Sequence, residues 1–338
     1  MSDKDVLVEA RELTKHFPVR RGVLRRIAAN VSAVERVNLQ IYRGETLGLV
    51  GESGCGKSTL GRLLLALLQP TRGEVLFMGQ DLTALSSREL KAARENMQIV
   101  FQDPASSLNP RLTCGQIIEE ALAIHRRGRR TERSHRVEEM LEKVGLRSEI
   151  ADRYPHELSG GQRQRVSIAR ALVLNPTFVV ADEAVSALDV SVQAQVLNLL
   201  MSLRRELELT YLFIAHDLAV VAYVADRIAV MYLGKVVEVA DSERLLEQPL
   251  HPYTAGLLSA IPNPQPGTDK RRSHVGGDIP SPVDPPSGCR FRTRCPAAQQ
   301  VCAQREPPLE EHEDGHWAAC HFAAEGVAKQ ILQERPGG

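Results

Sequence analysis

The sequence predicts an α/β fold built around a mostly parallel β-sheet. Three observations predict it. Residues 45–50 form an apolar, strand-like run, and a glycine-rich loop and a helical pattern at 57–68 follow directly. This strand–loop–helix order is typical of α/β folds. Two further short apolar runs, 177–181 and 211–215, end at acidic residues and at a histidine. Open α/β sheets bind their ligands along that edge.

The next elements follow from periodicity and turn residues. Val190–Leu207 predicts a helix, with apolar residues recurring at helical spacing. Residues 227–239, interrupted by Gly234, predict a hairpin of two strands. Beyond about His251, repeated prolines break up regular structure, and this tail holds four of the six cysteines. We therefore expect the tail to be a separate accessory module.

Composition restricts the partners and the location. Lysine plus arginine equals aspartate plus glutamate, so the net charge is zero, which disfavours a nucleic-acid binder. The basic runs 20–26 and 126–133 suit either a solvated loop or helix face, or contact with lipid head groups or an acidic partner. No apolar run approaches the roughly 20 residues that span a bilayer, and the N-terminus lacks a signal-peptide core. We expect a cytoplasmic chain that reaches the membrane through partner proteins.

The segment Gly51-Glu-Ser-Gly-Cys-Gly-Lys-Ser58 fits the phosphate-loop pattern. Its glycines let consecutive N–H groups surround phosphates, and the following helix adds the positive end of its dipole. Lys57 would reach the β- and γ-phosphates of a nucleotide, and Ser58 would bind Mg²⁺. The alternative is an ordinary glycine turn. The residues predicted to contact the nucleotide here are Gly51, Glu52, Ser53, Gly54, Cys55, Gly56, Lys57, Ser58 and Thr59.

Polar residues after the other strands complete the candidate site. Asp182 ends an apolar strand, where a second acid usually organises Mg²⁺, and Glu183 could position or deprotonate the attacking water. A solvated turn or a helix cap is the alternative for these two acids. The Gln102 amide could hold the metal or the water, and His216 could contact a γ-phosphate. A lone glutamine is more often a surface residue, and a lone histidine is more often structural.

These pieces, with Leu158-Ser-Gly-Gly-Gln162 between them, closely resemble the ATP-binding cassette (ABC) family over about residues 5–260. Ser159 and two glycines at a helix start also offer donors to a γ-phosphate. The resemblance implies an ATPase domain at 1–255, with a RecA-like core, a β-subdomain and a helical subdomain at about 105–175. An irregular module with the cysteines would occupy 256–338.

In this family two cassettes pack head to tail. The resemblance therefore implies roles for particular residues of this chain at the interface. Each ATP would lie between one phosphate loop and the partner's signature, here Leu158, Ser159, Gly160, Gly161 and Gln162. The dimer loop would be Ser186, Ala187, Leu188 and Asp189, with Asp189 linking the two sites.

The resemblance also assigns the chemistry. Glu183 would be the general base and His216 the γ-phosphate sensor. Mg²⁺ would be held by Ser58, Gln102 and Asp182, and Phe17 would stack on adenine. The family usually has proline and threonine where this chain has Ala184-Val185. Neither supplies chemistry, so we expect a hydrolysing site.

Four segments are similar to the ATPase subunits of bacterial oligopeptide and dipeptide importers. They are residues 101–110, 154–157, 251–254 and 285–296. This similarity implies a heterodimer with a second ABC ATPase, two transmembrane permease subunits and an extracytoplasmic peptide-binding protein, at the cytoplasmic face of the inner membrane. Nickel and glutathione importers share these features, so the cargo stays open. The alternative is a soluble ABC ATPase that acts on nucleic acid or ribosomes.

The tail cysteines are Cys289, Cys295, Cys302 and Cys320. Their spacing lacks the close pairs of structural zinc sites, which favours a [4Fe–4S] cluster over zinc or free thiols. Some importers of this group are similar in carrying such a cluster, which could also act as an iron or redox sensor for the ATPase. His312, His316 and His321 are expected to be solvated. The amide-rich phosphate loop could lower the pKa of Cys55.

Overall fold

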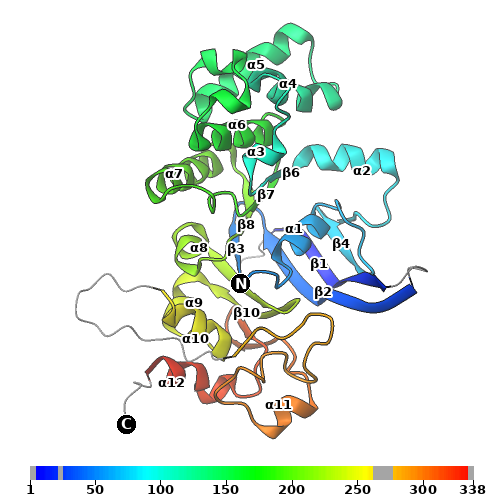
Figure 1. Cartoon of the computed structure of the whole chain (residues 1–338), viewed down its shortest axis with the longest axis vertical. Coiled ribbons are helices and arrows are strands. Elements are labelled where there is room, and N and C mark those ends of the chain that lie inside the picture. Colours follow the sequence, from blue (N-terminus) through cyan, green and yellow to red (C-terminus); the bar gives the residue numbers. More distant parts are fainter. Residues whose placement is uncertain (1–4, 22–25, 262–276, 334–338) are drawn as a thin grey trace.

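The structure is a computed structural model that describes residues 5–21, 26–261 and 277–333. In Figure 1 the molecule is elongated. A layer of helices forms its upper end, two sheets occupy the middle, and the C-terminal tail forms the lower end.

The main sheet has the order β11-β12-β10-β9-β3-β8-β7-β6 among the described residues. Its parallel strands are β3 (Thr46–Val50), β6 (Met97–Val100), β7 (Phe178–Asp182), β8 (Thr210–Ile214) and β9 (Arg227–Tyr232). Every residue of β3, β7 and β8 is buried, as in parallel strands covered on both faces. The predicted mostly parallel sheet is therefore confirmed.

The predicted hairpin is also confirmed. Strand β9 pairs antiparallel with β10 (Lys235–Asp241). Between them Leu233 and Gly234 have φ angles of 41° and 82°, and positive φ at both central residues matches the right-handed twist of the strands. The Gly234 N–H donates to the Cys55 carbonyl oxygen at 2.8 Å, so the hairpin tip supports the phosphate loop.

A second sheet, of order β2-β1-β4-β5, lies beside the first. It consists of β1 (Val6–Arg21), β2 (Arg26–Tyr42), β4 (Arg72–Phe77) and β5 (Gln80–Asp81), all antiparallel. The basic run 20–26 begins in the last residues of β1 and ends at the first residue of β2, and its residues 22–25 lie outside the described residues.

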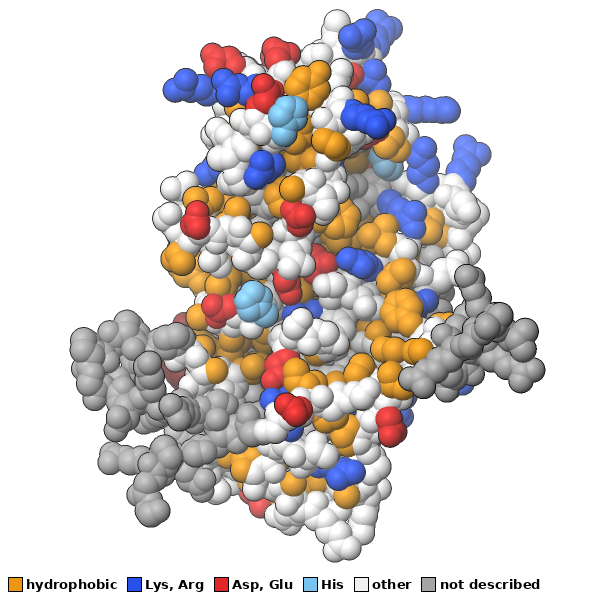
Figure 2. All heavy atoms as spheres, in the orientation of Figure 1, with side chains coloured by type: hydrophobic (Ala, Val, Ile, Leu, Met, Phe, Trp, Pro, Cys, Tyr) orange, Lys and Arg blue, Asp and Glu red, His pale blue; other side chains and the backbone are white. Residues whose placement is uncertain are grey.

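The upper helical layer contains α3 (Pro104–Ser107), α4 (Cys114–Ile124), α5 (Arg130–Lys143) and α6 (Gly160–Leu172), while α2 (Ser87–Ala93) follows the smaller sheet. The second basic run, 126–133, joins α4 to α5. Arg127 in it pairs with Glu95, and Arg133 pairs with Glu119 at 3.0 Å. Figure 2 shows basic and acidic side chains together at this end, which fits a solvated charged surface.

Helices α1, α7 and α8 lie near the main sheet. The sequence predicts the bounds of α7 correctly but makes α1 too long. Helix α7 spans Val190–Leu207 as predicted, whereas α1 spans Lys57–Leu64 and ends before residue 68. The chain turns there because Ala66 has a φ of 50° and the Leu67 N–H returns to the Arg62 carbonyl oxygen at 2.8 Å. Helix α8 (Leu218–Val224) lies against β3, where a Cβ on Gly48 would come within 2.1 Å of Val221.

The tail continues the main sheet. It contributes β11 (Glu310–Glu313) and β12 (His316–Ala318), and β12 pairs antiparallel with β10. Its helices are α11 (Gln300–Gln304) and α12 (Val327–Gln333), which follow α9 (Ser242–Glu247) and α10 (Pro252–Ser259). The division at residue 255 stays a prediction, but the tail shares backbone pairing with the main sheet.

Within the described ranges, the helices are all too short or too polar to cross a bilayer.

Candidate ATP site

The predicted site residues meet at one edge of the main sheet. Strands β3, β8, β7 and β6 are parallel neighbours, so their carboxyl ends share an edge. The phosphate loop follows β3, Gln102 follows β6, Asp182 ends β7 and His216 follows β8. This is the ligand-binding edge that the sequence predicts.

The phosphate loop is shaped so that only glycine fits at two places. Gly56 has a φ of 110°, and a Cβ there would lie 2.0 Å from the Ala33 carbonyl oxygen. A Cβ on Gly51 would lie 2.1 Å from the Met231 carbonyl oxygen. Gly56 is the N-cap of α1, and no side chain caps that helix. The first N–H groups of α1 are therefore free of side-chain caps, as an anion site requires.

The side chain of Lys57 bonds the backbone of the phosphate loop, and the side chain of Ser58 bonds the end of β7. The buried Lys57 ammonium donates to the carbonyl oxygens of Gly51 and Glu52 at 2.7 and 3.0 Å. The Ser58 hydroxyl donates to the Asp182 carboxylate at 2.7 Å. Two predicted Mg²⁺ ligands thus touch, and both offer the oxygen atoms that Mg²⁺ prefers.

The other loop residues differ in exposure. Ser53 and Gly54 are exposed, and Thr59 is half-buried on α1. Cys55 is buried, and burial raises the pKa of its thiol. The pKa of Cys55 is therefore not lowered by the loop, because loss of water around the sulfur outweighs the nearby Lys57 charge, and Cys55 serves as a small buried residue.

Glu183 occupies an unusual backbone conformation directly after β7. Its φ is 49°, which is strained for a residue with a side chain. Its N–H donates to the Ile214 carbonyl oxygen at 3.0 Å, which fixes it beside the end of β8. Its side chain is half-buried, while Ala184 and Val185 are buried. The two residues that depart from the family pattern therefore serve packing.

Gln102 and His216 are exposed at the same edge. Phe17 lies on the β1–β2 hairpin opposite Val31, and 37% of it is exposed. Two residues further along β2, Ala33 is the residue against which Gly56 packs. Phe17 thus presents an accessible ring on the strand pair that borders the phosphate loop.

The signature segment begins α6. The Ser159 hydroxyl accepts from the Gln162 N–H at 3.3 Å, and the Gln162 side chain accepts from the Ser159 N–H at 3.0 Å. Leu158 is buried and anchors this start. A Cβ on Gly160 would lie 3.7 Å from Leu188, and one on Gly161 would lie 2.6 Å from Val192. In Figure 1, α6 lies in the helical layer, apart from α1 beside the smaller sheet.

The predicted dimer loop adjoins this signature. Ser186, Ala187 and Asp189 are exposed, while Leu188 is half-buried beside Gly160. Asp189 is the N-cap of α7, and its side chain makes no capping bond. Val190 follows with 84% of its surface exposed.

The four tail cysteines converge but do not form a ligand set. Cys289, Cys295, Cys302 and Cys320 are free thiols that line one cavity of about 20 Å³. Burial raises the pKa of Cys295 to about 11 and that of Cys320 to about 12. Across the described ranges, no three His, Cys, Asp or Glu side chains are arranged to hold a metal ion. The arrangement of these thiols therefore does not support the predicted [4Fe–4S] cluster, which stays a prediction.

Of the tail histidines, His316 contradicts the expectation of solvation. It is fully buried, and its Nε2 bonds the equally buried Glu238 carboxylate at 2.8 Å. Glu238 also accepts the N–H groups of Leu250 and His251 at 2.7 and 2.9 Å. His316 sits on β12, whose pairing with β10 a local sequence pattern does not reveal.

Two residues that touch the phosphate loop were missed by the sequence reasoning. The Tyr253 hydroxyl accepts the Glu52 N–H at 2.9 Å. The Arg294 guanidinium makes two bonds to the Glu52 carboxylate, at 2.7 and 2.9 Å. Both residues lie in importer-like segments, 251–254 and 285–296, whose presence was the available signal.

Comparison with known proteins identifies the family. Residues 34–186 match the ABC transporter family, and residues 237–302 match the oligopeptide/dipeptide transporter C-terminal region. The oligopeptide transport ATP-binding protein AppF of Bacillus subtilis (strain 168) is 51% identical over 324 residues, covering 95% of this chain and 98% of AppF. The chain belongs to the ATP-binding proteins of the ABC transporter family. It is an ABC-type ATPase subunit, as the sequence predicts.

Other members of the family support this. The probable peptide ABC transporter ATP-binding protein y4tS of Sinorhizobium fredii (strain NBRC 101917 / NGR234) is 51% identical, covering 97% of this chain and 93% of y4tS. The ATP-binding cassette MJ0796, solved as a post-hydrolysis dimer bound to ADP and Pi, superposes with a TM-score of 0.62 at 33% identity. That match covers 70% of this chain and 99% of MJ0796, which confirms the predicted ABC cassette fold.

Proposed function

We propose that this chain is the ATP-hydrolysing subunit that energises the import of di- or oligopeptides through a membrane ABC transporter. One combination carries the proposal. The phosphate loop, Gln102, Asp182 and His216 lie along one sheet edge, and residues 237–302 match the oligopeptide/dipeptide transporter C-terminal region. The relatives AppF and y4tS are named for oligopeptide and peptide transport.

The residues at this sheet edge support specific roles in the binding of ATP and Mg²⁺. The loop N–H groups and Lys57 would bind the β- and γ-phosphates, and Ser58, Gln102 and Asp182 would hold Mg²⁺. When bound, Mg²⁺ neutralises charge that develops on the phosphate oxygens.

Two residues that follow strands β7 and β8, Glu183 and His216, then act in hydrolysis. Glu183 takes a proton from the attacking water, the water oxygen bonds the γ-phosphorus, and the bond to the ADP oxygen breaks. His216 at the end of β8 contacts the γ-phosphate. The strained φ of 49° at Glu183 supports its role, because such strain gathers at functional sites.

The second half of the site comes from a partner. The starts of α6 and α7 leave Ser159, Asp189 and Val190 exposed to solvent. A head-to-tail interface with a second cassette would cover such exposed residues. We propose that the partner is a second, homologous ABC ATPase, that Asp189 links the two ATP sites, and that Phe17 stacks on adenine. The assembly would include two transmembrane permease subunits and an extracytoplasmic peptide-binding protein, with this chain at the cytoplasmic face of the inner membrane.

Purification of the native protein from membranes tests this function. Co-purification of two membrane subunits, with ATPase activity that a peptide-loaded binding protein stimulates, is the expected result. Recovery with ribosomes or DNA and without membrane subunits would instead favour a soluble ATPase acting on nucleic acid.

We also propose that the four tail thiols bind a [4Fe–4S] cluster in the cell. Their convergence on one cavity supports this, although the thiols must move to take up the ligand geometry. Iron, acid-labile sulfide and zinc are assayed after anaerobic purification. About four irons and four sulfides per chain are expected, and absence of both would reject the cluster.

A further inference from the structure

The phosphate loop carries a carboxylate that a phosphate site has to accommodate. Glu52 is the second residue of the loop. It lies between Gly51, which follows β3, and the exposed Ser53 and Gly54. ATP brings several negative charges to this loop, and a free carboxylate there would repel them. The structure places the guanidinium of Arg294 directly on this carboxylate.

The pairing of Arg294 with Glu52 is bidentate and sheltered. The two bonds measure 2.7 and 2.9 Å, and the Arg294 side chain is only 7% exposed. Arg294 also donates to the Tyr232 hydroxyl at 3.4 Å. A planar guanidinium fixes both oxygens of a carboxylate at once, which a lysine ammonium does not do.

Glu52 is held at its backbone as well. Its N–H donates to the Tyr253 hydroxyl at 2.9 Å, and its carbonyl oxygen accepts from Lys57 at 3.0 Å. The rings of Tyr253, Tyr232 and Phe291 pack on one another, with centroids 4.7 to 5.4 Å apart. Arg294 is three residues beyond Phe291, and its N–H donates to the Phe291 carbonyl oxygen at 2.9 Å. The arginine is therefore carried by a turn that is itself packed against the loop.

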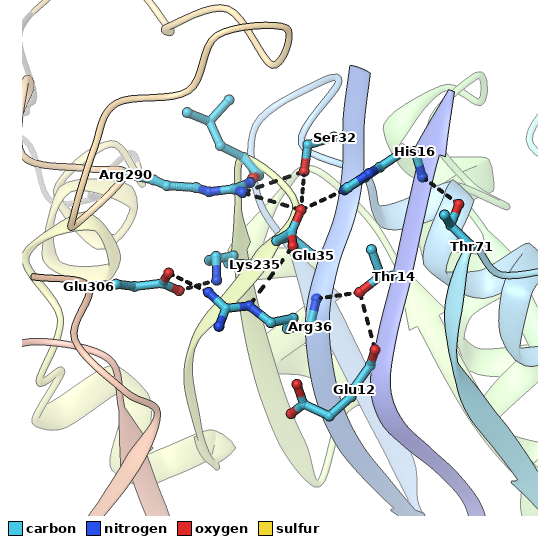
Figure 3. A network of polar contacts seen from close by, with 11 residues as sticks. Glu12, Thr14, His16, Ser32, Glu35, Arg36, Thr71, Lys235, Arg290 and Glu306 are labelled. Carbon is cyan, nitrogen blue, oxygen red and sulfur yellow. Dashed lines mark hydrogen bonds and ion pairs between the residues drawn. The ribbon is translucent and has the colours of Figure 1, made fainter. Parts of the chain in front are cut away.

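A second network joins the tail to β2 and β10 (Figure 3). Arg290 lies 3.7 Å from the Glu35 carboxylate, and Arg36 bonds Glu306 at 2.7 Å. Lys235 also pairs with Glu306. These contacts hold tail residues against the β2 segment around Ala33, on which Gly56 packs. The tail is thus fixed relative to both ends of the phosphate loop.

We propose that Arg294 is a positioning residue of the ATP site, which neutralises the Glu52 carboxylate and holds it away from the phosphates. Arg294 itself does not touch the nucleotide. The cysteine-bearing tail therefore sets the affinity of the chain for ATP. This inference rests on the ATP site proposed above and adds a residue from outside its motifs.

Equilibrium binding of a fluorescent ATP analogue with Mg²⁺ to the full-length chain tests the inference. Arg294→Gln leaves the Glu52 charge unopposed, so the Kd is expected to rise about tenfold. The control is Arg292→Gln, because Arg292 lies on the same turn but, among the described residues, its side chain bonds Ser287 within the tail, at 2.9 and 3.3 Å. Its Kd is expected to match the wild type.

The double variant Glu52→Gln/Arg294→Gln separates positioning from a purely structural role. Removal of the carboxylate removes the repulsion, so the Kd should return to within about threefold of the wild type. A double variant that binds as poorly as Arg294→Gln, or an Arg294→Gln protein with wild-type affinity, overturns the inference.

Thermal unfolding of each variant is measured first. If Arg294→Gln does not fold, the same comparison is made with Arg294→Lys. This variant keeps the positive charge but cannot make the two parallel bonds to the Glu52 carboxylate. Its weaker binding should again be relieved by Glu52→Gln, and absence of relief counts against the inference. If the wild-type chain does not bind ATP, the proposed function fails instead.

Discussion

At the scale of single residues, the segment His251-Pro-Tyr-Thr254 connects helix capping with the ATP site. The His251 Nδ1 accepts the Tyr253 N–H at 3.0 Å as the N-cap of α10, and the Tyr253 hydroxyl then meets Glu52. His251 is buried, and burial lowers its pKa to about 4, against a smaller opposing effect of Glu238. The imidazole is therefore neutral at neutral pH and free to accept.

This low pKa predicts acid sensitivity. The unfolded chain binds a proton at His251 below about pH 6.5, whereas the folded chain does so only near pH 4. Stability from this group is thus present above pH 6.5 and is lost as the pH falls toward 4. Between pH 7 and 5 the loss should be about 2 kcal/mol.

The matched variant is His251→Asn, which keeps an N-cap acceptor but does not titrate. Urea unfolding at pH 7 and pH 5 should show a smaller loss of stability for the variant than for the wild type. Equal losses would show that His251 is not the responsible group.

At the scale of elements, the start of α1 is the most constrained position in the site. Gly56 combines a φ of 110° with a neighbouring carbonyl 2.0 Å from where a Cβ would stand. Gly54, in the same loop, has a φ of 78° and open space around it. The two glycines therefore separate steric contact from backbone strain.

We expect Gly56→Ala to lower the free energy of unfolding by about 3 kcal/mol or more, because Ala33 on β2 cannot yield. Gly54→Ala should cost about 1 kcal/mol from its left-handed backbone alone. Urea unfolding monitored by circular dichroism checks both. Similar costs for the two variants would contradict the packing of β2 against the loop.

Local patterns predicted the elements that build the site, because buried parallel strands read as apolar runs and α7 repeats at helical spacing. The structure puts the motifs after β3, β7 and β8 at the strand ends that these patterns predict, while their roles in ATP binding stay predictions. Arg294, Tyr253 and His316 escaped the sequence reasoning, since each acts on a partner far away in the chain. Glu52 and Arg294 are separated by 242 positions, and only the fold brings them together.

At the scale of the whole molecule, the tail and the ATPase core form one connected structure. Strand β12 extends the main sheet, and the buried Glu238–His316 pair lies at that junction. Arg294 and Arg290 bind the tail to the phosphate loop and to β2. Arg294, which pairs with Glu52, directly precedes Cys295, one of the tail thiols.

The Glu238–His316 pair makes this junction testable. His316→Ala leaves the Glu238 carboxylate buried without its partner, which should cost about 3–5 kcal/mol. His312→Ala is the control, because His312 is only half-buried and bonds a backbone carbonyl at 3.3 Å. Chemical unfolding should rank the two variants in that order, and a mild effect of His316→Ala would mean that β12 contributes little.

The central claim is that this chain forms half of a composite ATPase. The direct measurement is sedimentation of the Glu183→Gln chain mixed with the homologous ATPase proposed as its partner, with and without ATP, alongside the turnover rate. ATP should hold the two subunits together, Ser159→Arg should abolish that association, and turnover should fall by about 10²–10⁴-fold. A mass that does not change with ATP, or undiminished turnover in Glu183→Gln, would contradict the claim.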